Sequence, residues 1–285
     1  MLDVACFHFR LTMQDHRLQS QRFELKYLVP GEFTQPMRDF VGSYLELDDY
    51  SVGKPNNSYE VHSVYLDSDR LDIHHATFNG DKNRFKLRLR YYDADPASPV
   101  FCEIKQRVDN CILKRRCAVA RADVPQLLAG QLPEPDELLS PELRHLVSLQ
   151  RFLELMLQLD ARPRLHNYYR REAWVSPHDN SIRITFDRHI SVEPYFRPDA
   201  PPTMTRPTRI YTEFIVLELK FTGRFPNWFH AFVERFNLMR TASMKYSGGV
   251  EMLGEHRFLK PDSQPEVSLA EVSLEPLNLH EQLVS

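Results

Sequence analysis

Cysteine is scarce in this sequence and does not occur in a metal-binding or redox pattern. The four cysteines, Cys6, Cys102, Cys111 and Cys117, form no CxxC pair. Three of them lie in strand-like segments, where cysteine commonly acts as a small buried hydrophobe. We therefore expect reduced thiols in a cytoplasmic protein.

Long apolar runs are also missing. A membrane-spanning helix needs roughly 18 or more consecutive apolar residues, and no segment approaches that length. The first residues, MLDVACFHFRLTMQDHR, contain acids and histidines where a signal peptide needs a continuous apolar stretch. We expect neither a membrane span nor an export signal, so any membrane partner would be a separate chain.

The chain has no overall excess of positive charge. Its formal net charge is −3, with 36 Lys and Arg against 39 Asp and Glu, which disfavours general attraction to nucleic acid or to an anionic membrane. The cations are nevertheless concentrated, because the segment 84–116 holds nine Lys or Arg against four Asp or Glu. That local charge of +5 leaves −8 for the remainder of the chain.

The length and composition suit one large domain. Of the 285 residues, 42% are hydrophobic and 11% aromatic, which is enough to bury a sizeable core. We expect an N-terminal arm at 1–20, a single domain at 21–257 and a disordered acidic tail at 258–285. From Pro261 onward the tail has five acids and no Lys or Arg.

The segment RFKLRLRY, residues 84–91, places a cation at every second position. Alternate side chains of a β-strand project to the same face, so the cations share one face and the Phe, Leu and Tyr side chains share the other. A face of this kind needs a counter-charge. The segment therefore predicts a strand with one apolar face and one strongly basic face.

Similar alternation recurs along the chain and is separated by short polar turns. The other strand-like segments are RFELKYLV, SYEVHSVYLD, VFCEIKQRV, CILKRRCAVA, RLHNYYRREAWV, SIRITFDRHISV and YTEFIVLELKF. Helical periodicity occurs at 33–44, at 123–160 and after Pro226, and five prolines in 194–209 predict an extended loop without regular pairing. The pattern predicts an α+β fold, an eight-stranded antiparallel β-barrel with helices at its ends and flanks.

The charged faces of several strands favour a polyanionic ligand. If those faces all point inward, the barrel holds many cations and a few carboxylates, which is unfavourable unless an anion neutralises them. Arg and Lys together suit the successive phosphates of a linear chain, and the carboxylates suit Mg²⁺ or Mn²⁺. The alternative is that these are ordinary solvated sheet faces, but such faces mix both signs with neutral polar residues.

The motifs in their order resemble a known family. FELKY, KLRLRYY, FCEIKQR, YRREAW, IRITFD, VLELK and SMKYSGG follow one another between about 22 and 254. This succession is similar to the polyphosphate polymerase domain of vacuolar transporter chaperone (VTC) proteins, which belongs to the triphosphate tunnel metalloenzymes. The resemblance implies an eight-stranded barrel, ATP as phosphoryl donor and inorganic polyphosphate as product. Arg22 stands where the superfamily signature has its first Glu.

The resemblance and the strand faces together assign roles to fifteen residues. The expected catalytic residues are Arg88, Arg90, Lys105, Arg171, Arg183 and Lys245. The expected substrate-binding residues are Lys26, Lys86, Arg107, Lys114, Arg116 and Lys220. Glu218 is the expected ligand of Mn²⁺ or Mg²⁺. Glu24 and Glu103 are either further metal ligands or ion-pair partners of neighbouring cations.

Two other functions remain open. The same fold could use water as acceptor and act as a tripolyphosphatase or nucleoside triphosphatase, although no motif places a histidine to activate water. The domain could also bind polyphosphate without turnover. A nucleic-acid binder is disfavoured by the acidic overall charge.

The pair His74-His75 lies in a short amphipathic connection. No third ligand is spaced near it in the sequence, so we interpret it as a packing or surface feature.

Overall fold

The structure is a computed structural model that describes residues 22–109, 111–134, 137–177, 179, 181–241 and 245–259. The expected arm at 1–20 and the expected tail beyond Leu259 lie outside the described residues.

The described residues form a single antiparallel sheet with ten strands. The strands are β1 (Arg22–Pro30), β2 (Glu46–Leu47), β3 (Tyr59–Asp67), β4 (Arg84–Tyr91), β5 (Val100–Val108), β6 (Cys111–Val119), β7 (Arg162–Val175), β8 (Ile182–Pro194), β9 (Thr208–Arg209) and β10 (Phe214–Thr222).

Helices fill the connections between these strands. The α-helices are α1 (Thr34–Val41), α2 (Asp72–Phe78), α3 (Val124–Leu128), α4 (Leu143–Gln158), α5 (Asn227–Arg235) and α6 (Ser247–Leu253). The short 3₁₀ helices are η1 (Gly31–Phe33), η2 (Pro55–Asn57), η3 (Arg121–Asp123) and η4 (Glu255–Arg257). None of the helices in the described part of the chain is long and apolar enough to cross a membrane.

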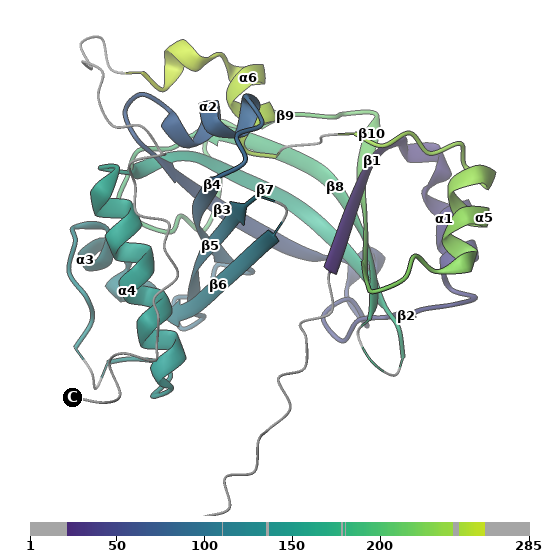
Figure 1. Ribbon diagram of the computed structural model, residues 1–285, viewed down its shortest axis with the longest axis horizontal. Helices are drawn as coiled ribbons and strands as arrows, with labels where there is room; N and C mark the ends of the chain where they lie inside the picture. The colour runs from purple at the N-terminus through teal and green to yellow at the C-terminus, as the bar shows by residue number, and fades with distance from the viewer. Residues whose placement is uncertain are drawn as a thin grey trace, which may run out of the picture.

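The long strands follow the order β1-β10-β8-β7-β3-β4-β5-β6, while β2 pairs with β7 and β9 pairs with β8. β1 and β6 are the two ends of this order, and the described residues include no backbone pairing between them. The sheet is therefore a strongly curled half-barrel (Figure 1). The α+β antiparallel prediction is confirmed, but the expected closure into a barrel is not.

Two hydrophobic cores cover the outer, convex face of the sheet. One joins α3 and α4 to the strands around β4 and β5, with Phe152 and Leu155 fully buried. The other packs α1 and α5 on β1, β10 and β8 through Phe229 and Phe232. Figure 1 shows these helix pairs on opposite flanks, with α2 and α6 together at one end. The helices cover the apolar side of the sheet and leave its concave side to polar residues.

Strand β4 has the two faces that its sequence predicts. Phe85, Leu87 and Leu89 are completely buried in the outer core. Their neighbours Lys86 and Arg88 project to the concave side, because side chains alternate along a strand.

The segment 194–209 was predicted to be a loop without regular pairing, but its C-terminal end pairs with a strand. Thr208 and Arg209 form β9 and pair with Val192 and Ser191 of β8. The last proline of the segment is Pro207, so the backbone N–H groups that follow it are free to join a ladder.

Candidate functional site

Cations from strands far apart in the sheet meet on the concave face. Lys105 of β5 lies 3.3 Å from a carboxylate oxygen of Glu24 on β1, although these strands belong to opposite ends of the sheet order. Lys26 of β1 lies 3.1 Å from the same carboxylate and 3.9 Å from that of Glu218 on β10. The curl therefore brings the charged faces of the two sheet ends within contact of each other.

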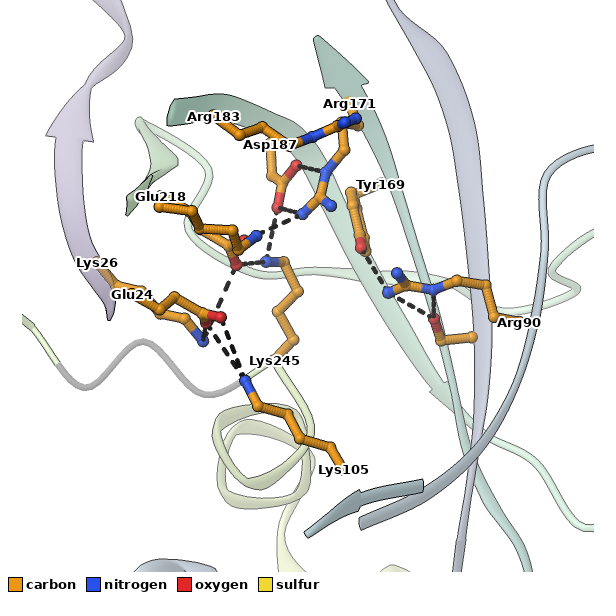
Figure 2. A network of polar contacts seen from close by, with 12 residues as sticks. Glu24, Lys26, Arg90, Lys105, Tyr169, Arg171, Arg183, Asp187, Glu218 and Lys245 are labelled. Atoms are coloured by element: carbon orange, nitrogen blue, oxygen red, sulfur yellow. Dashed lines mark hydrogen bonds and ion pairs between the residues drawn. The ribbon is translucent and has the colours of Figure 1, made fainter. Parts of the chain in front are cut away.

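The most buried part of this face is a cluster around Glu218 and Asp187 (Figure 2). Lys245, two residues before the start of α6, donates to both carboxylates, with Nζ–oxygen distances of 2.7 Å to Asp187 and 3.0 Å to Glu218. Arg171 binds Asp187 through two nitrogens at 2.6 and 2.7 Å and reaches Glu218 at 3.4 Å. Lys220 lies 2.5 Å from the second oxygen of Glu218.

The two carboxylates and Lys245 are held in their charged forms, whereas burial lowers the pKa of Lys220, although Glu218 opposes that shift. Burial alone would raise the pKa of Glu218, but Lys220, Lys245 and Arg171 outweigh it and hold that pKa well below its usual value. The pKa of Asp187 is lowered in the same way, against its burial, by Arg171 and Lys245. Burial opposes the charge of Lys245, yet Asp187 and Glu218 raise its pKa. Opposite charges at close range therefore stabilise the ionised forms of Glu218, Asp187 and Lys245 against their burial.

A second cluster surrounds Glu103 of β5. Arg88 binds one of its oxygens through Nε at 2.8 Å and through Nη2 at 2.6 Å. Lys114 and Arg116 of β6 lie 3.2 and 3.5 Å from the other oxygen. Arg88, Arg90 and Lys114 hold the pKa of Glu103 below its usual value in spite of the burial that would raise it. Three cations therefore share one carboxylate.

A row of lysines adjoins this cluster. Lys86, Lys105 and Lys114 are direct neighbours across β4, β5 and β6. Lys86 has no ion-pair partner among the described residues, and its burial, with help from Lys26 and Lys105, lowers its pKa to about 7. Burial lowers the pKa of Lys114 to about 8, although Glu103 opposes this. The three lysines of this row therefore outnumber the two carboxylates that contact it, Glu24 and Glu103.

Arg90 is buried, and no carboxylate in the described part of the chain contacts it. Its guanidinium donates to the hydroxyl oxygen of Tyr169 at 2.9 Å and lies 3.4 Å from that of Ser63 (Figure 2). Both partners are neutral. A buried arginine with neutral partners is available to an anion that enters the concave face.

The family of the chain follows from a comparison with known protein families. A model of the VTC domain family matches residues 21–254. This chain belongs to the VTC domain family. The resemblance seen in its motifs is thereby confirmed.

Two solved structures are also similar to this VTC domain. One is the PH1819 protein from Pyrococcus horikoshii OT3, with 12% sequence identity, a TM-score of 0.40, and coverage of 82% of this chain and 99% of that one. The other is a putative adenylate cyclase from Vibrio parahaemolyticus, with 11% identity, a TM-score of 0.39, and coverage of 81% and 98%.

The concave face of the VTC domain brings together most of the residues predicted to form its site. The ion-pair and hydrogen-bond contacts above join Lys26, Glu24, Arg88, Arg90, Glu103, Lys105, Lys114, Arg116, Arg171, Glu218, Lys220 and Lys245. Lys86 lies beside them in the lysine row.

Two predicted residues have their contacts outside these two clusters. Arg183 is bound to Asp48, which follows β2, at 2.5 Å. Arg107 donates to the backbone oxygen of Asp109 at the end of β5 and lies opposite Arg84. Their roles in binding remain predictions.

Some residues of the face were not predicted to act there. Asp187 shares a strand face with Arg183 at a spacing of four, so the period-two pattern was the signal for it. Tyr65 accepts a hydrogen bond from Arg88 at 3.2 Å, and Tyr169 accepts one from Arg90. Asp48 lies in a turn, where no periodicity indicates the direction of a side chain.

The carboxylates of the concave face are candidate metal ligands. Within the described residues no three of them place ligand atoms within 4.8 Å of one another. Glu218 and Asp187 are close enough to share Lys245, whereas Glu103 belongs to the other cluster. A pair of oxygen donors beside a phosphate site fits Mg²⁺ or Mn²⁺, which usually bind through one or two carboxylates and substrate phosphates.

Proposed function

We propose that this VTC domain is a polyphosphate polymerase that transfers the γ-phosphate of ATP to a growing inorganic polyphosphate chain. Membership of the VTC domain family supports a polyphosphate-related function. The observation that carries the proposal is the convergence of Lys and Arg side chains from β1, β4, β5, β6, β7 and β10 on one concave face. The half-barrel would act as the tunnel, with the contact between Lys105 and Glu24 bridging its open side.

Phosphoryl transfer suits a face of this composition. The transition state spreads charge over the oxygens of the transferred group, so positioning and charge neutralisation supply most of the catalysis. Arg88, Arg90 and Arg171 offer planar donors to successive phosphates. The terminal phosphate of the growing chain is already ionised, so its attack needs no general base.

The cluster around Glu218 would mark the reacting end of the triphosphate. Arg171 and Lys245 would move part of their donor capacity from Asp187 and Glu218 to phosphate oxygens. Glu218, with Asp187 beside it, would hold a Mg²⁺ or Mn²⁺ ion that neutralises charge on the phosphates. ATP is the donor in this scheme, and we propose a cytoplasmic location for the reaction.

The test is the product formed from ATP. Purified protein is incubated with ATP and Mn²⁺, and the products are separated on a gel stained for polyphosphate. The proposal predicts a ladder of polyphosphate together with ADP. Orthophosphate as the only phosphate product would contradict the polymerase and favour the triphosphatase.

A substitution of Glu218 separates catalysis from binding. Removal of one preorganised charged group costs roughly 100- to 1,000-fold in turnover, so Glu218→Gln is expected to lower ADP formation by about that factor while polyphosphate still binds. Glu234→Gln, on the exposed side of α5, is the matched control and should keep full activity. Equal activity of the two variants would contradict the role of Glu218.

A binding module without turnover is the second candidate. It is favoured by the three close cations around Glu218, which compensate its charge without a metal ion. Polyphosphate binding by the unaltered protein, with no ADP formed in the presence of Mn²⁺ or Mg²⁺, would select this function.

A further inference from the structure

A group of potential metal ligands lies outside the concave face, between α2 and η4. His74 and His75 belong to α2, and Glu255 is the first residue of η4, about 180 positions later. Their ligand atoms all lie within 4.8 Å of one another, which no other group of three or more His, Cys, Asp or Glu among the described residues achieves. The third ligand that the sequence did not indicate is thus supplied by the fold.

The spacing of these atoms is close to that of a tetrahedral site. His74 Nε2 lies 3.1 Å from one carboxylate oxygen of Glu255, and His75 Nε2 lies 3.8 Å from the other. Ligands about 2.1 Å from a tetrahedral metal are about 3.4 Å apart. Both separations from Glu255 are within about 0.4 Å of that value, and the ligand atoms of the two histidines lie within 4.8 Å of each other.

The two histidines differ in how firmly they are held. The ring of His74 is 1% exposed and packs edge-on against Tyr246, while its backbone N–H donates to the carboxylate of Asp67 at 2.9 Å. The side chains of His75 and Glu255 are 44% and 42% exposed. One ligand is thus preorganised, and the other two leave an ion open to solvent.

We propose that His74, His75 and Glu255 bind a transition-metal ion of the zinc class, with water completing the coordination. Two imidazoles and a carboxylate form a ligand set that Zn²⁺ commonly adopts, whereas Mg²⁺ selects oxygen ligands. The ion would join α2 to the segment that follows α6. α2 and α6 already meet at Tyr246, which directly precedes α6 and donates to Asp67 at 2.6 Å. The carboxylate of Asp67 also accepts the backbone N–H of His74 in α2.

This inference is independent of the proposed function, because its ligands are distinct from those of the concave face. A zinc ion between α2 and η4 would stabilise the end of the sheet where Lys245 enters the concave face. That benefit requires only that the native protein bind the ion more tightly than the unfolded chain does.

The experiment is a calorimetric titration of the metal-free full chain with Zn²⁺ in excess Mg²⁺, which occupies sites built from oxygen ligands. The wild type is expected to bind about one equivalent. His75→Gln and Glu255→Gln should each weaken binding by at least about tenfold. Both substituted side chains are partly exposed, and glutamine preserves polarity, so each variant should melt near the wild-type temperature without metal.

Two control variants locate the site. His230→Gln, on the exposed side of α5, and Glu218→Gln, on the concave face, are expected to leave Zn²⁺ affinity unchanged. An absence of binding in the wild type would overturn the proposal. So would unchanged affinity in His75→Gln and Glu255→Gln, or a loss of Zn²⁺ affinity in Glu218→Gln.

Discussion

At the scale of the residue, the titration of Lys86 makes the charge of the concave face depend on pH near neutrality. Its pKa is lowered to about 7, from the usual 10.5, by burial and by the neighbouring Lys26 and Lys105. Between these two values the folded protein binds fewer protons than the unfolded chain at this position, so the free energy of unfolding increases as pH rises from about 7 to 10.5.

Lys86→Met should therefore reduce the gain in melting temperature between pH 7 and pH 10, because methionine fills similar space without titrating. It should also raise the melting temperature at pH 7. The check is thermal unfolding of the ligand-free protein across this range, with Lys82→Met as an exposed control. A variant profile identical to that of the wild type would show that Lys86 is not destabilised by its surroundings.

The site residues that the sequence predicted lie on β-strands, except Lys245, which the motif SMKYSGG indicated. Lys105 and Arg88 could be assigned to the concave face because alternation is a local rule that needs only neighbouring residues. Asp48 could not, since it lies in a turn. Alternation also indicated the face on which Glu103 lies. It could not indicate that Arg88, Lys114 and Arg116 would all contact this carboxylate, because those contacts depend on the pairing of three strands.

At the scale of the element, Tyr246 connects α6 to the start of α2. Its hydroxyl donates to Asp67, whose carboxylate also accepts the backbone N–H groups of Ser68, Ile73 and His74. Burial raises the pKa of Asp67 to about 6, although these hydrogen bonds oppose the shift. Stability contributed by the protonated form is therefore lost as pH rises from the usual 3.8 through about 6, where the carboxylate ionises.

Tyr246→Phe is expected to lower the free energy of unfolding by about 1–3 kcal/mol, because a buried carboxylate loses a donor. The loss should be larger at pH 8 than at pH 5, since the hydrogen bond is stronger to the ionised form. Chemical denaturation at the two pH values measures it. Tyr44→Phe, at a tyrosine that is 47% exposed, should change stability little, and an equally small effect at Tyr246 would refute the connection.

The strands were easier to predict than the junctions between elements. β4 and β5 have the bounds suggested by their alternation, since strand periodicity and turn residues are both local. The contact of α2 with η4 involves residues far apart in the sequence. No local pattern relates His75 to Glu255, so the sequence alone indicates no third ligand beside the histidine pair.

At the scale of the whole molecule, the decisive property is the curl of the sheet. The eight long strands and their antiparallel character follow from their patterns and turns, but the degree of closure does not. It depends on accumulated twist and on the helices packed against the convex face. The result is a half-barrel whose end strands, β1 and β6, do not pair with each other among the described residues. Side chains from β1 and β5 nevertheless make contact across its interior.

The binding of a linear phosphate chain to the concave face can be measured most directly by the melting temperature during titration with tripolyphosphate. A ligand at about 100 times its Kd adds roughly 2.7 kcal/mol to stability, which corresponds to about 5–10 °C for a domain of this size. We predict such a rise for the wild type, a much smaller rise for Arg88→Met and Arg90→Met, and a normal rise for Arg144→Met, whose side chain is 76% exposed. An unchanged melting temperature, or an equal rise in all of these proteins, would contradict a phosphate-binding concave face.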